Sequence, residues 1–434
     1  MKLCMIGTGY VGLVSGTCFA DIGNQVICVD KDKNKIFKLN SGISPIYEPG
    51  LDELIKKNYS AKRLSFTTDI KSAVNSSDII FICVGTPTKK RSINVDLSFV
   101  YKCTKEILKY TKKKKILVTK STVPIGTGDQ IEKILRIKKK LFTVISNPEF
   151  LREGEAIRDF RYPDRIVVGS NDKKIFNQMR KLYSPLINKG AKFFTTTRKG
   201  AELIKYASNA FLATKITFIN ELANLCEKSG INIEDISLGM GSDSRIGSRF
   251  LRAGPAYGGS CFPKDTKGLI SAADKYKVNL SVVKSVIKSN HDRVNLLTYK
   301  IHKILGSNLK DKKISFLGVT FKPNTDDMRD STSLKMIPYL SKKGAIINYY
   351  DPSGEKNEFR KIKNCSYKNN IKNNCNNSDL IILLTEWDEF KTIDFKKIVK
   401  NNKFKVYDLR NLYNPEEMKR NKIKYYSVGR PNTK

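Results

Sequence analysis

One cysteine lies among residues that suit a nucleophile. Cys261 follows the run Gly258-Gly259-Ser260 and precedes Phe262-Pro263-Lys264-Asp265. Proline suits the first turn of a helix, so the thiol is expected just ahead of a helix N-terminus and close to Lys264, and both neighbours favour the thiolate. The two glycines are expected to let the backbone approach a ligand closely. An inert buried cysteine is the alternative, and the polar, glycine-rich surroundings favour the nucleophile.

Three further candidates share one face of a predicted helix. Glu202, Lys205 and Asn209 fall at positions i, i+3 and i+7, a spacing that places them on the same side of an α-helix. The functional interpretation is a lysine and an amide that point into a cleft. An exposed ion pair explains the same spacing, so this trio alone does not decide between the two.

The first residues carry a phosphate-binding turn. The run Gly7-Thr8-Gly9-Tyr10-Val11-Gly12 follows an apolar stretch and opens a helical one. These glycines permit a tight turn, a close approach to a pyrophosphate and close helix–strand packing, while the helix N-terminus faces the phosphates. Asp30 follows Gly12 by 18 positions, at the end of the second apolar run, where its carboxylate should bind ribose hydroxyls and repel a 2′-phosphate. The sequence therefore predicts a dinucleotide site that prefers NAD to NADP, with Lys35 near the ribose.

Loops after the predicted strands supply more polar groups. Ser121–Gly128 and Asn147–Gly154 each follow a strand of the first region, and ligands of open α/β sheets bind outside such strand ends. Ordinary turn chemistry is the alternative explanation for both loops. In the last region the run Gly318–Pro323 lacks the dinucleotide fingerprint, and it offers Lys322 to a phosphate.

The elements that must position these residues form two α/β regions around a helical one. In the first region apolar runs alternate with helix-like stretches, which predicts a parallel doubly wound sheet with strands at 2–7, 25–30, 79–84, 116–119 and 142–146. Residues 201–227 contain no glycine or proline and predict one long helix. The last region has four expected strands, at 314–319, 345–350, 380–384 and 405–409, and a basic tail after Asn421 that is expected to be frayed. The predicted fold is α/β, with two Rossmann-like doubly wound domains, 1–197 and 306–434, joined by a central helical domain, 198–305, that holds the long helix.

Composition narrows the class of protein. Of the 434 residues, 40% are hydrophobic and 9% aromatic, which argues against wholesale disorder. With only His291 and His302, neither a histidine-based triad nor a histidine-rich site is expected, and no metal is predicted. The first 20 residues could pass for a signal peptide, but they carry the phosphate-binding glycines instead. No run of about 18 apolar residues occurs, so no membrane partner is expected, and a cytoplasmic location is predicted.

The nine cysteines form no CxxC pair, so zinc knuckles and thioredoxin-like redox motifs are unsupported. Four of them lie in apolar segments and are expected to be small buried hydrophobes: Cys4, Cys18, Cys28 and Cys83.

The charge leaves two interpretations open. There are 80 Lys+Arg against 42 Asp+Glu, so the net charge is +38, which would suit a nucleic acid. The lysines are spread along the chain, however, and the short runs Lys112–Lys115 and Lys138–Lys140 fall where helices or loops should turn to solvent. A solvated, lysine-rich surface is favoured, and no nucleic-acid partner is predicted.

Taken together, these motifs resemble those of the UDP-glucose 6-dehydrogenases, within the wider UDP-glucose/GDP-mannose dehydrogenase family. GTGYVG, STVPIGT, NPEFLREG, ELIKYASNAF, YGGSCFPKD and FKPNTDDMRDS occur in that family's order and spacing, over about residues 1–425. The run Asp243–Gly247 with Phe250 resembles the UDP-glucose branch, whereas UDP-N-acetylmannosamine enzymes favour a histidine beside the cysteine. GDP-mannose enzymes share the GGSC core, and GDP-mannose or another nucleotide sugar is the alternative substrate.

The resemblance implies a four-electron oxidation of UDP-glucose to UDP-glucuronate, with two NAD used in succession. It implies that Cys261 traps the aldehyde as a thiohemiacetal that becomes a thioester, and that Lys205 and Asn209 stabilise the oxyanions. Glu149 would activate the hydrolytic water, and the base of the first step would be Lys205 or a water held by other polar residues. The implied catalytic residues are Cys261, Lys205, Asp265, Glu149, Thr122 and Asn209, of which Thr122 and Asp265 would hold that water.

The family's binding residues carry over in the same way. Those implied for NAD are Gly7, Gly9, Tyr10, Val11, Gly12, Asp30, Lys35, Thr86, Thr122, Glu153, Lys264 and Arg329. Those implied for the substrate UDP-glucose are Glu149, Phe150, Leu151, Arg152, Glu153, Lys205, Asn209, Arg245, Phe250, Leu251, Arg252, Ala253, Gly254, Tyr257, Gly258, Lys322 and Arg410. The resemblance also implies that 1–197 binds NAD, that 198–305 forms a homodimer through the long helix, and that 306–434 binds the UDP-sugar. Arg245 is then expected to reach the substrate of a neighbouring subunit.

Two other classes stay in competition at this point. A nucleic-acid-binding protein without enzymatic activity would use the basic surface but would need neither Cys261 nor Asp30. A one-step NAD-dependent hydroxyacid dehydrogenase of the 6-phosphogluconate type would share the architecture and the helical lysine, but it needs no nucleophilic cysteine.

Overall fold

The computed structural model describes residues 1–89 and 92–431. The chain forms two compact units, the first of Met1–Ser208 with Lys267–Val278 and the second of Asn209–Thr266 with Asn279–Lys434. Two of the three divisions, at 208/209 and 266/267, fall within helices, and the three-domain boundaries given above stay a prediction.

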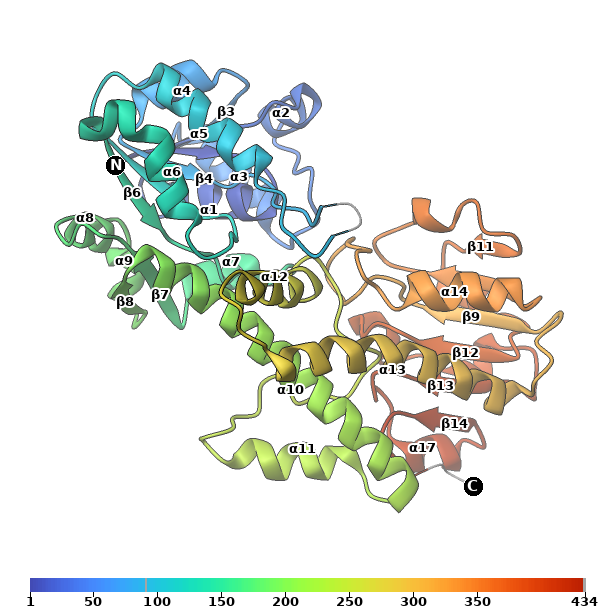
Figure 1. Ribbon diagram of the computed structural model, residues 1–434. Coiled ribbons are helices and arrows are strands. Elements are labelled where there is room, and N and C mark those ends of the chain that lie inside the picture. The colour runs from blue at the N-terminus through green and yellow to red at the C-terminus, as the bar shows by residue number, and fades with distance from the viewer. Residues whose placement is uncertain (90–91, 432–434) are drawn as a thin grey trace. The chain divides into compact units, whose positions relative to one another are not determined.

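Eight strands form the sheet of the first unit (Figure 1). They are β1 (Lys2–Ile6), β2 (Gln25–Val29), β3 (Leu64–Thr67), β4 (Ile79–Ile82), β5 (Lys115–Thr119), β6 (Phe142–Ser146), β7 (Arg165–Gly169) and β8 (Lys192–Thr196). Their order is β3-β2-β1-β4-β5-β6-β7-β8, and only β6 and β7 are antiparallel neighbours. The first six follow the 3-2-1-4-5-6 order of a doubly wound dinucleotide-binding sheet, which confirms the predicted fold class.

A six-stranded parallel sheet forms the second unit. Its strands are β9 (Lys313–Leu317), β10 (Ile346–Tyr350), β11 (Cys365–Tyr367), β12 (Leu380–Leu383), β13 (Lys405–Asp408) and β14 (Lys424–Ser427). The order β11-β10-β9-β12-β13-β14 repeats the 3-2-1-4-5-6 pattern of the first sheet. The chain therefore builds the same doubly wound arrangement twice.

Helices connect these strands. In the first unit they are α1 (Tyr10–Asp21), α2 (Lys33–Asn40), α3 (Leu51–Ser60), α4 (Ile70–Ser76), α5 (Ser98–Tyr110), α6 (Thr127–Leu135), η1 (Arg136–Leu141), α7 (Ala156–Arg161), α8 (Ile175–Leu182) and α9 (Ser184–Ile187). In the second unit they are α11 (Ile233–Ser242), α13 (Ser281–Leu305), α14 (Ser333–Lys342), η2 (Asn357–Phe359), α15 (Ile371–Cys375), η3 (Asp388–Phe390), α16 (Phe395–Ile398) and α17 (Pro415–Arg420). Two helices, α10 (Arg198–Ser229) and α12 (Phe262–Lys275), run from one unit into the other.

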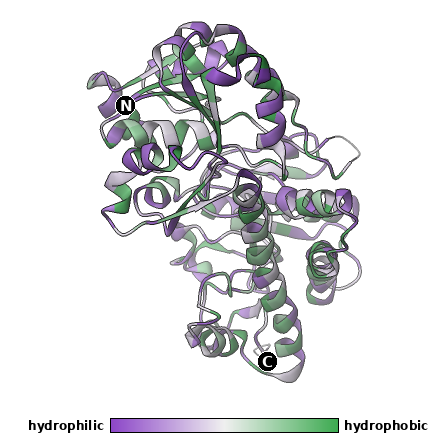
Figure 2. Ribbon diagram, turned by 60° about the vertical axis from the view of Figure 1, so that its left-hand side comes forward, coloured by the Kyte–Doolittle hydropathy of each residue, from purple (hydrophilic) through white to green (hydrophobic). Residues whose placement is uncertain are grey.

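Local chemistry explains where several helices begin. Asp32, Asp69, Asn232 and Asn414 each precede a helix and accept a hydrogen bond from a backbone N–H of its first turn, which satisfies a donor that the helix leaves open. The predicted long helix is confirmed as the 32-residue α10. In Figure 2 the helices change between green and purple along their length, as expected for helices that cover a sheet on one side only.

Each sheet has apolar cores on both faces. Leu3 and Met5 of β1 join one core of the first unit, and Cys4 and Ile6 join the other, as the alternation of a strand requires. In the second unit α10 and α13 cover one face of the sheet, so that Ile219, Leu297 and Phe316 share a core. The cysteines that were expected to be buried hydrophobes are confirmed as buried: Cys4, Cys18, Cys28 and Cys83.

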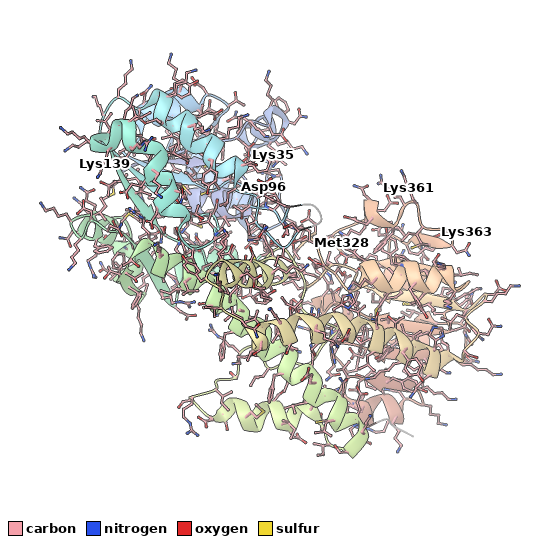
Figure 3. The ribbon with its side chains drawn as sticks, viewed as in Figure 1. Lys35, Asp96, Lys139, Met328, Lys361 and Lys363 are labelled. Atoms are coloured by element: carbon pink, nitrogen blue, oxygen red, sulfur yellow. The ribbon has the colours of Figure 1, made fainter. Side chains whose placement is uncertain are left out.

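Two expectations about surfaces are wrong. The tail after Asn421 is not frayed as far as the structure describes it, because β14 completes the second sheet and Tyr425 and Val428 are buried. Lys115 is buried as well, since it begins β5 and its ammonium donates to the carbonyl oxygens of Asn75 and Ser77. Of the lysines labelled in Figure 3, Lys139, Lys361 and Lys363 are exposed, as expected of a solvated surface, and Lys35 is half-buried. Within residues 1–89 and 92–431, no helix combines the length and apolarity needed to span a membrane.

Candidate active site

The glycine turn of the first unit has the geometry of a phosphate-binding turn. Gly7 has a φ of +103°, and a Cβ there would lie 2.8 Å from the Cys83 carbonyl oxygen. A Cβ on Gly12 would lie 1.9 Å from the Gly7 oxygen, so only glycine allows α1 to begin this close to β1. A Cβ on Gly9 would meet no atom within 4 Å, and the N-terminal N–H groups of α1 follow directly. This open side is where a pyrophosphate would fit.

Asp30 lies beside this turn at the end of β2. Its carboxylate accepts hydrogen bonds of 2.9 Å from both the N–H and the hydroxyl of Thr8, and one of 3.1 Å from the Asp32 N–H. Burial acts to raise the pKa of Asp30, but these donors outweigh it and hold the pKa below its usual value. The group is therefore an ionised acceptor, as recognition of an NAD ribose requires.

The second unit contains a similar turn after its first strand, but the carboxylate beside that turn is buried. Gly318 has a φ of +76° and donates to the Tyr350 oxygen, and Asp351 follows β10 as Asp30 follows β2. The Asp351 carboxylate is fully buried and accepts from the N–H groups of Val319 and Thr320, at 2.8 and 3.3 Å. This acid stabilises its own turn and is closed to a ligand.

In the first unit, Glu202 fixes the loop after β5. The Glu202 carboxylate accepts from the N–H groups of Gly126 and Gly128, at 2.6 and 2.7 Å, and from the Ser146 hydroxyl at 3.0 Å. Burial raises its pKa to about 7, although the donors oppose the shift. With 3% of Glu202 exposed, the exposed ion pair considered for the helical trio is excluded. The same loop is tied to the loop after β4 by the Thr86 hydroxyl, which donates to the Thr122 oxygen at 2.9 Å.

Glu149 lies at the carboxyl end of β6 and is held from several sides. One carboxylate oxygen accepts from the Phe150 N–H at 2.8 Å, and the other accepts from the Ser15 hydroxyl of α1 at 3.2 Å. Lys120, which follows β5, forms an ion pair with Glu149 at 2.7 Å while its own side chain is 3% exposed. Burial acts to lower the pKa of Lys120, but the charge of Glu149 outweighs it and the pKa lies above its usual value.

Lys205 of α10 is buried and lies over an aromatic ring. Its ammonium is 5.1 Å from the centre of the Phe150 ring, and the Arg165 guanidinium is 4.2 Å from the same ring. The face of Phe150 thus attracts cations, and the first unit brings Glu149, Phe150 and Lys205 together.

The second unit places Cys261 next to a polar cluster. Cys261 is half-buried and directly precedes α12, with Pro263 in the first turn as expected. Asp265 is fully buried, and its two oxygens accept from the Asn209 amide and the Lys264 ammonium, each at 2.6 Å. The Asp265 N–H donates to the Cys261 oxygen at 2.8 Å. Asp265 thus lies one helical turn after Cys261 and holds the side chains of Asn209 and Lys264 there.

Gly258 and Gly259 lie close to other parts of the chain. The approach to a ligand that was expected of them stays a prediction. A Cβ on Gly258 would lie 2.4 Å from the Asp330 oxygen, and one on Gly259 would lie 2.7 Å from the Phe321 ring. Gly259 also has a φ of +79°, so the turn before Cys261 admits little but glycine.

Arg410 binds backbone oxygens near this turn. Its guanidinium donates to the oxygens of Leu384 and Phe321, at 2.8 and 3.0 Å, and a Cβ on Gly254 would lie 3.2 Å from it. Phe250 has a φ of +66°. This backbone conformation is uncommon for a residue with a side chain, and such strained residues cluster at functional sites.

The other residues proposed from the sequence lie in varied surroundings. Three arginines pair with carboxylates nearby in the chain: Arg152 with Asp159 and Glu155, Arg245 with Asp243, and Arg329 with Asp327. The Tyr10 hydroxyl pairs with Glu48, and Lys322 lies over the Phe321 ring. Buried members of the set are Glu153, Leu251, Ala253, Gly254 and Tyr257, half-buried members are Val11, Lys35 and Leu151, and Arg252 is exposed.

Three residues of these surroundings were missed from the sequence. Lys120 forms the ion pair with Glu149. Glu48 accepts hydrogen bonds from backbone N–H groups of 154–157, and Arg293 of α13 donates to the Gly254 oxygen. Lys120 directly follows a predicted strand end, which could have marked it. No local signal marks Glu48 or Arg293.

Known proteins match the chain along its whole length. Models of the UDP-glucose/GDP-mannose dehydrogenase family match in three parts, the NAD binding domain at 1–187, the central domain at 199–292 and the UDP binding domain at 315–415. The chain is 47% identical over 436 residues to the UDP-glucose 6-dehydrogenase of Rhizobium meliloti (strain 1021), with 99% of this chain and 100% of the relative covered. It is 46% identical over 432 residues to the Rickettsia felis enzyme of the same name, with 99% and 96% covered.

A solved structure agrees with these relatives. The UDP-glucose dehydrogenase of the archaeon Pyrobaculum islandicum superimposes with a TM-score of 0.90 at 31% identity, covering 99% of this chain and 97% of that one. The glycine turn and the acid at the end of β2 provide the dinucleotide site that such enzymes need. The chain therefore belongs to the UDP-glucose/GDP-mannose dehydrogenase family.

Proposed function

We propose that this protein is an NAD-dependent UDP-glucose 6-dehydrogenase that oxidises the C6 alcohol of UDP-glucose to a carboxylate in two steps. The observation that carries the proposal is Cys261 at the start of α12, beside the buried cluster of Asn209, Lys264 and Asp265. A one-step alcohol dehydrogenase has no use for a thiol there. The relatives named above support the choice of UDP-glucose over GDP-mannose.

NAD, when bound, accepts one hydride in each oxidation. In the first step Lys205, or a water held by Thr122 and Asp265, takes the hydroxyl proton as C6 loses hydride and becomes an aldehyde. The Cys261 thiolate then adds to the aldehyde carbon and forms a thiohemiacetal. Loss of a second hydride converts this adduct to a thioester.

Hydrolysis completes the reaction. Glu149 takes a proton from water, which attacks the thioester carbon and releases the carboxylate and the thiol. Asn209 and Lys205 donate to the oxyanions, and buried donors of this kind stabilise developing charge strongly. The balance is one alcohol, two NAD and one water consumed, with one carboxylate, two NADH and three protons formed.

Binding of UDP-glucose is assigned by analogy with the family. The loop at 250–258, Lys322 and Arg410 of the second unit would hold the nucleotide sugar, together with Phe150 and its neighbours. NAD would lie on the glycine turn with its ribose at Asp30. We also propose a cytoplasmic location, since both UDP-glucose and NAD are cytoplasmic metabolites.

We propose further that the enzyme is a homodimer. Phe211, Phe218 and Leu225 of α10 are 66%, 48% and 61% exposed and recur every seven residues, which forms one apolar stripe. The variant Phe218→Glu should yield monomers in sedimentation experiments. Phe37→Glu, which changes a similarly exposed phenylalanine of α2, should leave the mass unchanged.

The test of the activity is NADH absorbance with UDP-glucose, GDP-mannose, UDP-galactose and UDP-N-acetylmannosamine assayed side by side. We expect UDP-glucose to give the highest kcat/KM and two NADH for each sugar consumed. A higher kcat/KM with GDP-mannose would select the alternative substrate, and one NADH for each UDP-glucose would reject the two-step reaction.

A further inference from the structure

The segment 251–261, the cysteine loop, belongs to no helix or strand, yet Leu251, Ala253–Pro255, Tyr257 and Gly259 are buried. Leu251 and Tyr257 are 3% and 6% exposed. Backbone groups in such a place need partners other than water. The structure supplies them from the side chains of two helices.

Gly254 is bound on both sides of its backbone. Its N–H donates to the Asn220 side-chain oxygen at 2.9 Å, and its carbonyl oxygen accepts from Arg293 Nε at 2.7 Å. Arg293 Nη1 also donates to the backbone oxygen of Asn220 at 2.9 Å. These bonds close a ring between α10, α13 and the loop.

Tyr257 is bound in the same way by a single side chain. Its N–H donates to the Asn290 side-chain oxygen at 2.9 Å, and the Asn290 amide donates to the Tyr257 oxygen at 3.0 Å. Asn290 and Arg293 are three residues apart on α13 and so share one face. They bind residues of the loop that are likewise three apart, Gly254 and Tyr257.

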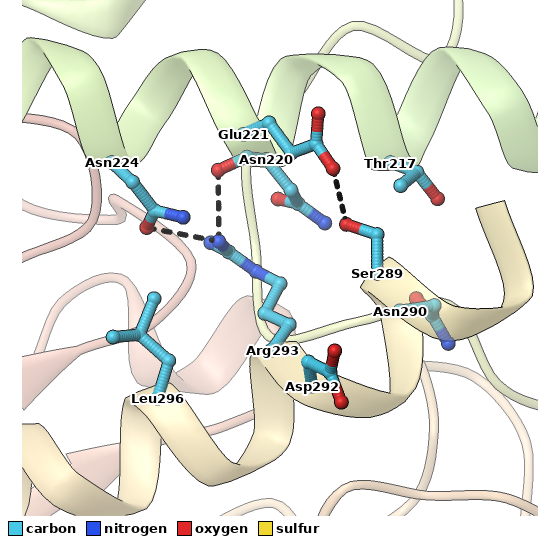
Figure 4. A pocket seen from close by; sticks show the side chains of 9 residues that line it. All are labelled: Thr217, Asn220, Glu221, Asn224, Ser289, Asn290, Asp292, Arg293 and Leu296. Atoms are coloured by element: carbon cyan, nitrogen blue, oxygen red, sulfur yellow. Dashed lines mark hydrogen bonds between the residues drawn. The ribbon is translucent and has the colours of Figure 1, made fainter. Parts of the chain in front are cut away.

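A cavity of about 200 Å³ borders Arg293 between α10 and α13 (Figure 4). Within the described residues, Arg293 Nη2, the Asn220 amide nitrogen and the Thr217 hydroxyl have no hydrogen-bond partner. Burial lowers the pKa of Arg293 to about 10, so the guanidinium stays charged at neutral pH. A buried charge bonded mostly to carbonyl oxygens costs stability, which indicates a purpose other than folding.

We propose that Asn220, Asn290 and Arg293 are positioning residues that fix the cysteine loop and thereby aim the Cys261 thiol at the carbon it attacks. The inference rests on the proposed function, in which Cys261 is the nucleophile. Only three residues separate Tyr257 from Cys261, so a shift of the bound backbone is transmitted to the thiol. A misplacement of about 1 Å can cost about 10²-fold in rate.

Two variants test the proposal through kcat and through an activity-independent readout. Arg293→Ala should lower kcat about 10²-fold without changing the Kd of NAD. The truncated side chain opens onto the cavity, so millimolar guanidinium should restore part of kcat, whereas urea and KCl at equal concentration should not. Asn290→Asp keeps the acceptor but replaces the donor to Tyr257, and it should lower kcat about tenfold.

The matched control is Asn224→Ala. Asn224 lines the same cavity and accepts from Arg293 at 3.4 Å, but it forms no bond to the loop, so its kcat should stay that of wild type. The second readout is the rate of Cys261 alkylation by iodoacetamide, followed by peptide mass spectrometry. It should change in Arg293→Ala and Asn290→Asp and stay constant in Asn224→Ala.

Failure of the positioning proposal can be distinguished from failure of the proposed function. Folded Asn290→Asp and Arg293→Lys proteins with wild-type kcat, KM and alkylation rate would overturn the proposal, and these conservative variants decide it if Arg293→Ala does not fold. If the wild-type protein does not oxidise UDP-glucose, the proposed function fails, while the alkylation rates still test the positioning of the thiol.

Discussion

The ammonium of Lys120 lies 2.7 Å from the carboxylate of Glu149, and both side chains are shielded from solvent, with 3% and 13% exposed. They come from the ends of two adjacent parallel strands, β5 and β6. The pair holds the carboxylate of Glu149, the base that is proposed for thioester hydrolysis, in one orientation.

This pair predicts strong coupling between the two positions. Lys120→Met should lower the free energy of unfolding by about 3 kcal/mol, since it leaves Glu149 as an uncompensated buried charge. The double variant Lys120→Met/Glu149→Gln should be destabilised by less than the sum of the single changes. Urea unfolding of the four proteins checks this, and additive losses would show that the ion pair has no energetic role.

Asp30 should decide the choice of cofactor. Its ionised carboxylate would repel the 2′-phosphate of a dinucleotide bound at this turn, so wild type should use NAD far better than NADP. Asp30→Ala should reduce the ratio of the two kcat/KM values by about tenfold or more, which corresponds to about 1.4 kcal/mol. Asp32→Ala, which changes the next acid along the chain, is the control and should keep the ratio. Equal use of both cofactors by wild type would contradict the assignment.

Glu202 should make stability depend on pH. With a pKa of about 7 in the folded protein and about 4.3 in the unfolded chain, the folded state binds this proton more tightly. The free energy of unfolding that Glu202 contributes should therefore fall as the pH rises from about 4 to about 7, by up to about 3 kcal/mol. Glu202→Gln removes this titration. The free energy of unfolding of wild type minus that of Glu202→Gln should therefore shrink or reverse as the pH rises from about 4 to about 7. A difference that is constant with pH would reject the raised pKa.

Cys261 should carry the covalent intermediate. Cys261→Ser should fold and bind both ligands, yet lose at least about 10³-fold in NADH production, because a serine hydroxyl is not ionised near neutral pH. Glu149→Gln should slow hydrolysis, so that enzyme quenched in denaturant carries a sugar-nucleotide adduct on Cys261. Cys365→Ser, at the other half-buried cysteine, should behave as wild type. Mass spectrometry that finds no adduct would count against the thioester.

The sequence predicted those features whose signals are local. The turn at Gly7, the acid at Asp30 and the helix that begins after Cys261 each depend on residues a few positions apart. Five strands were not predicted, namely β3, β7, β8, β11 and β14. β3 and β14 alternate between buried and more exposed positions, and β8 and β11 contain no fully buried residue, so these four lack the continuous apolar run of a buried strand.

Features that depend on tertiary contacts could not be read in this way. Glu202 binds backbone amides 74 and 76 residues away. Every residue type except proline supplies such an amide, so the sequence carries no trace of the pairing. The glycines before Cys261 are required by the Phe321 ring and the Asp330 backbone, which only the folded second unit brings beside them.

The contrast between the turn at Asp30 and the turn at Asp351 bears on how the intermediate of the proposed two-step oxidation would be retained. The Asp351 carboxylate is buried and bound by the backbone of its own turn, whereas Asp30 is half-buried, so of these two turns the one at Asp30 offers a carboxylate to a ribose. Two oxidations at one such turn require spent NADH to leave and fresh NAD to enter between them. During that exchange a free aldehyde could diffuse away and react elsewhere in the cell. A thiohemiacetal bond to Cys261 would then serve as a tether that retains the half-oxidised sugar until the second cofactor arrives.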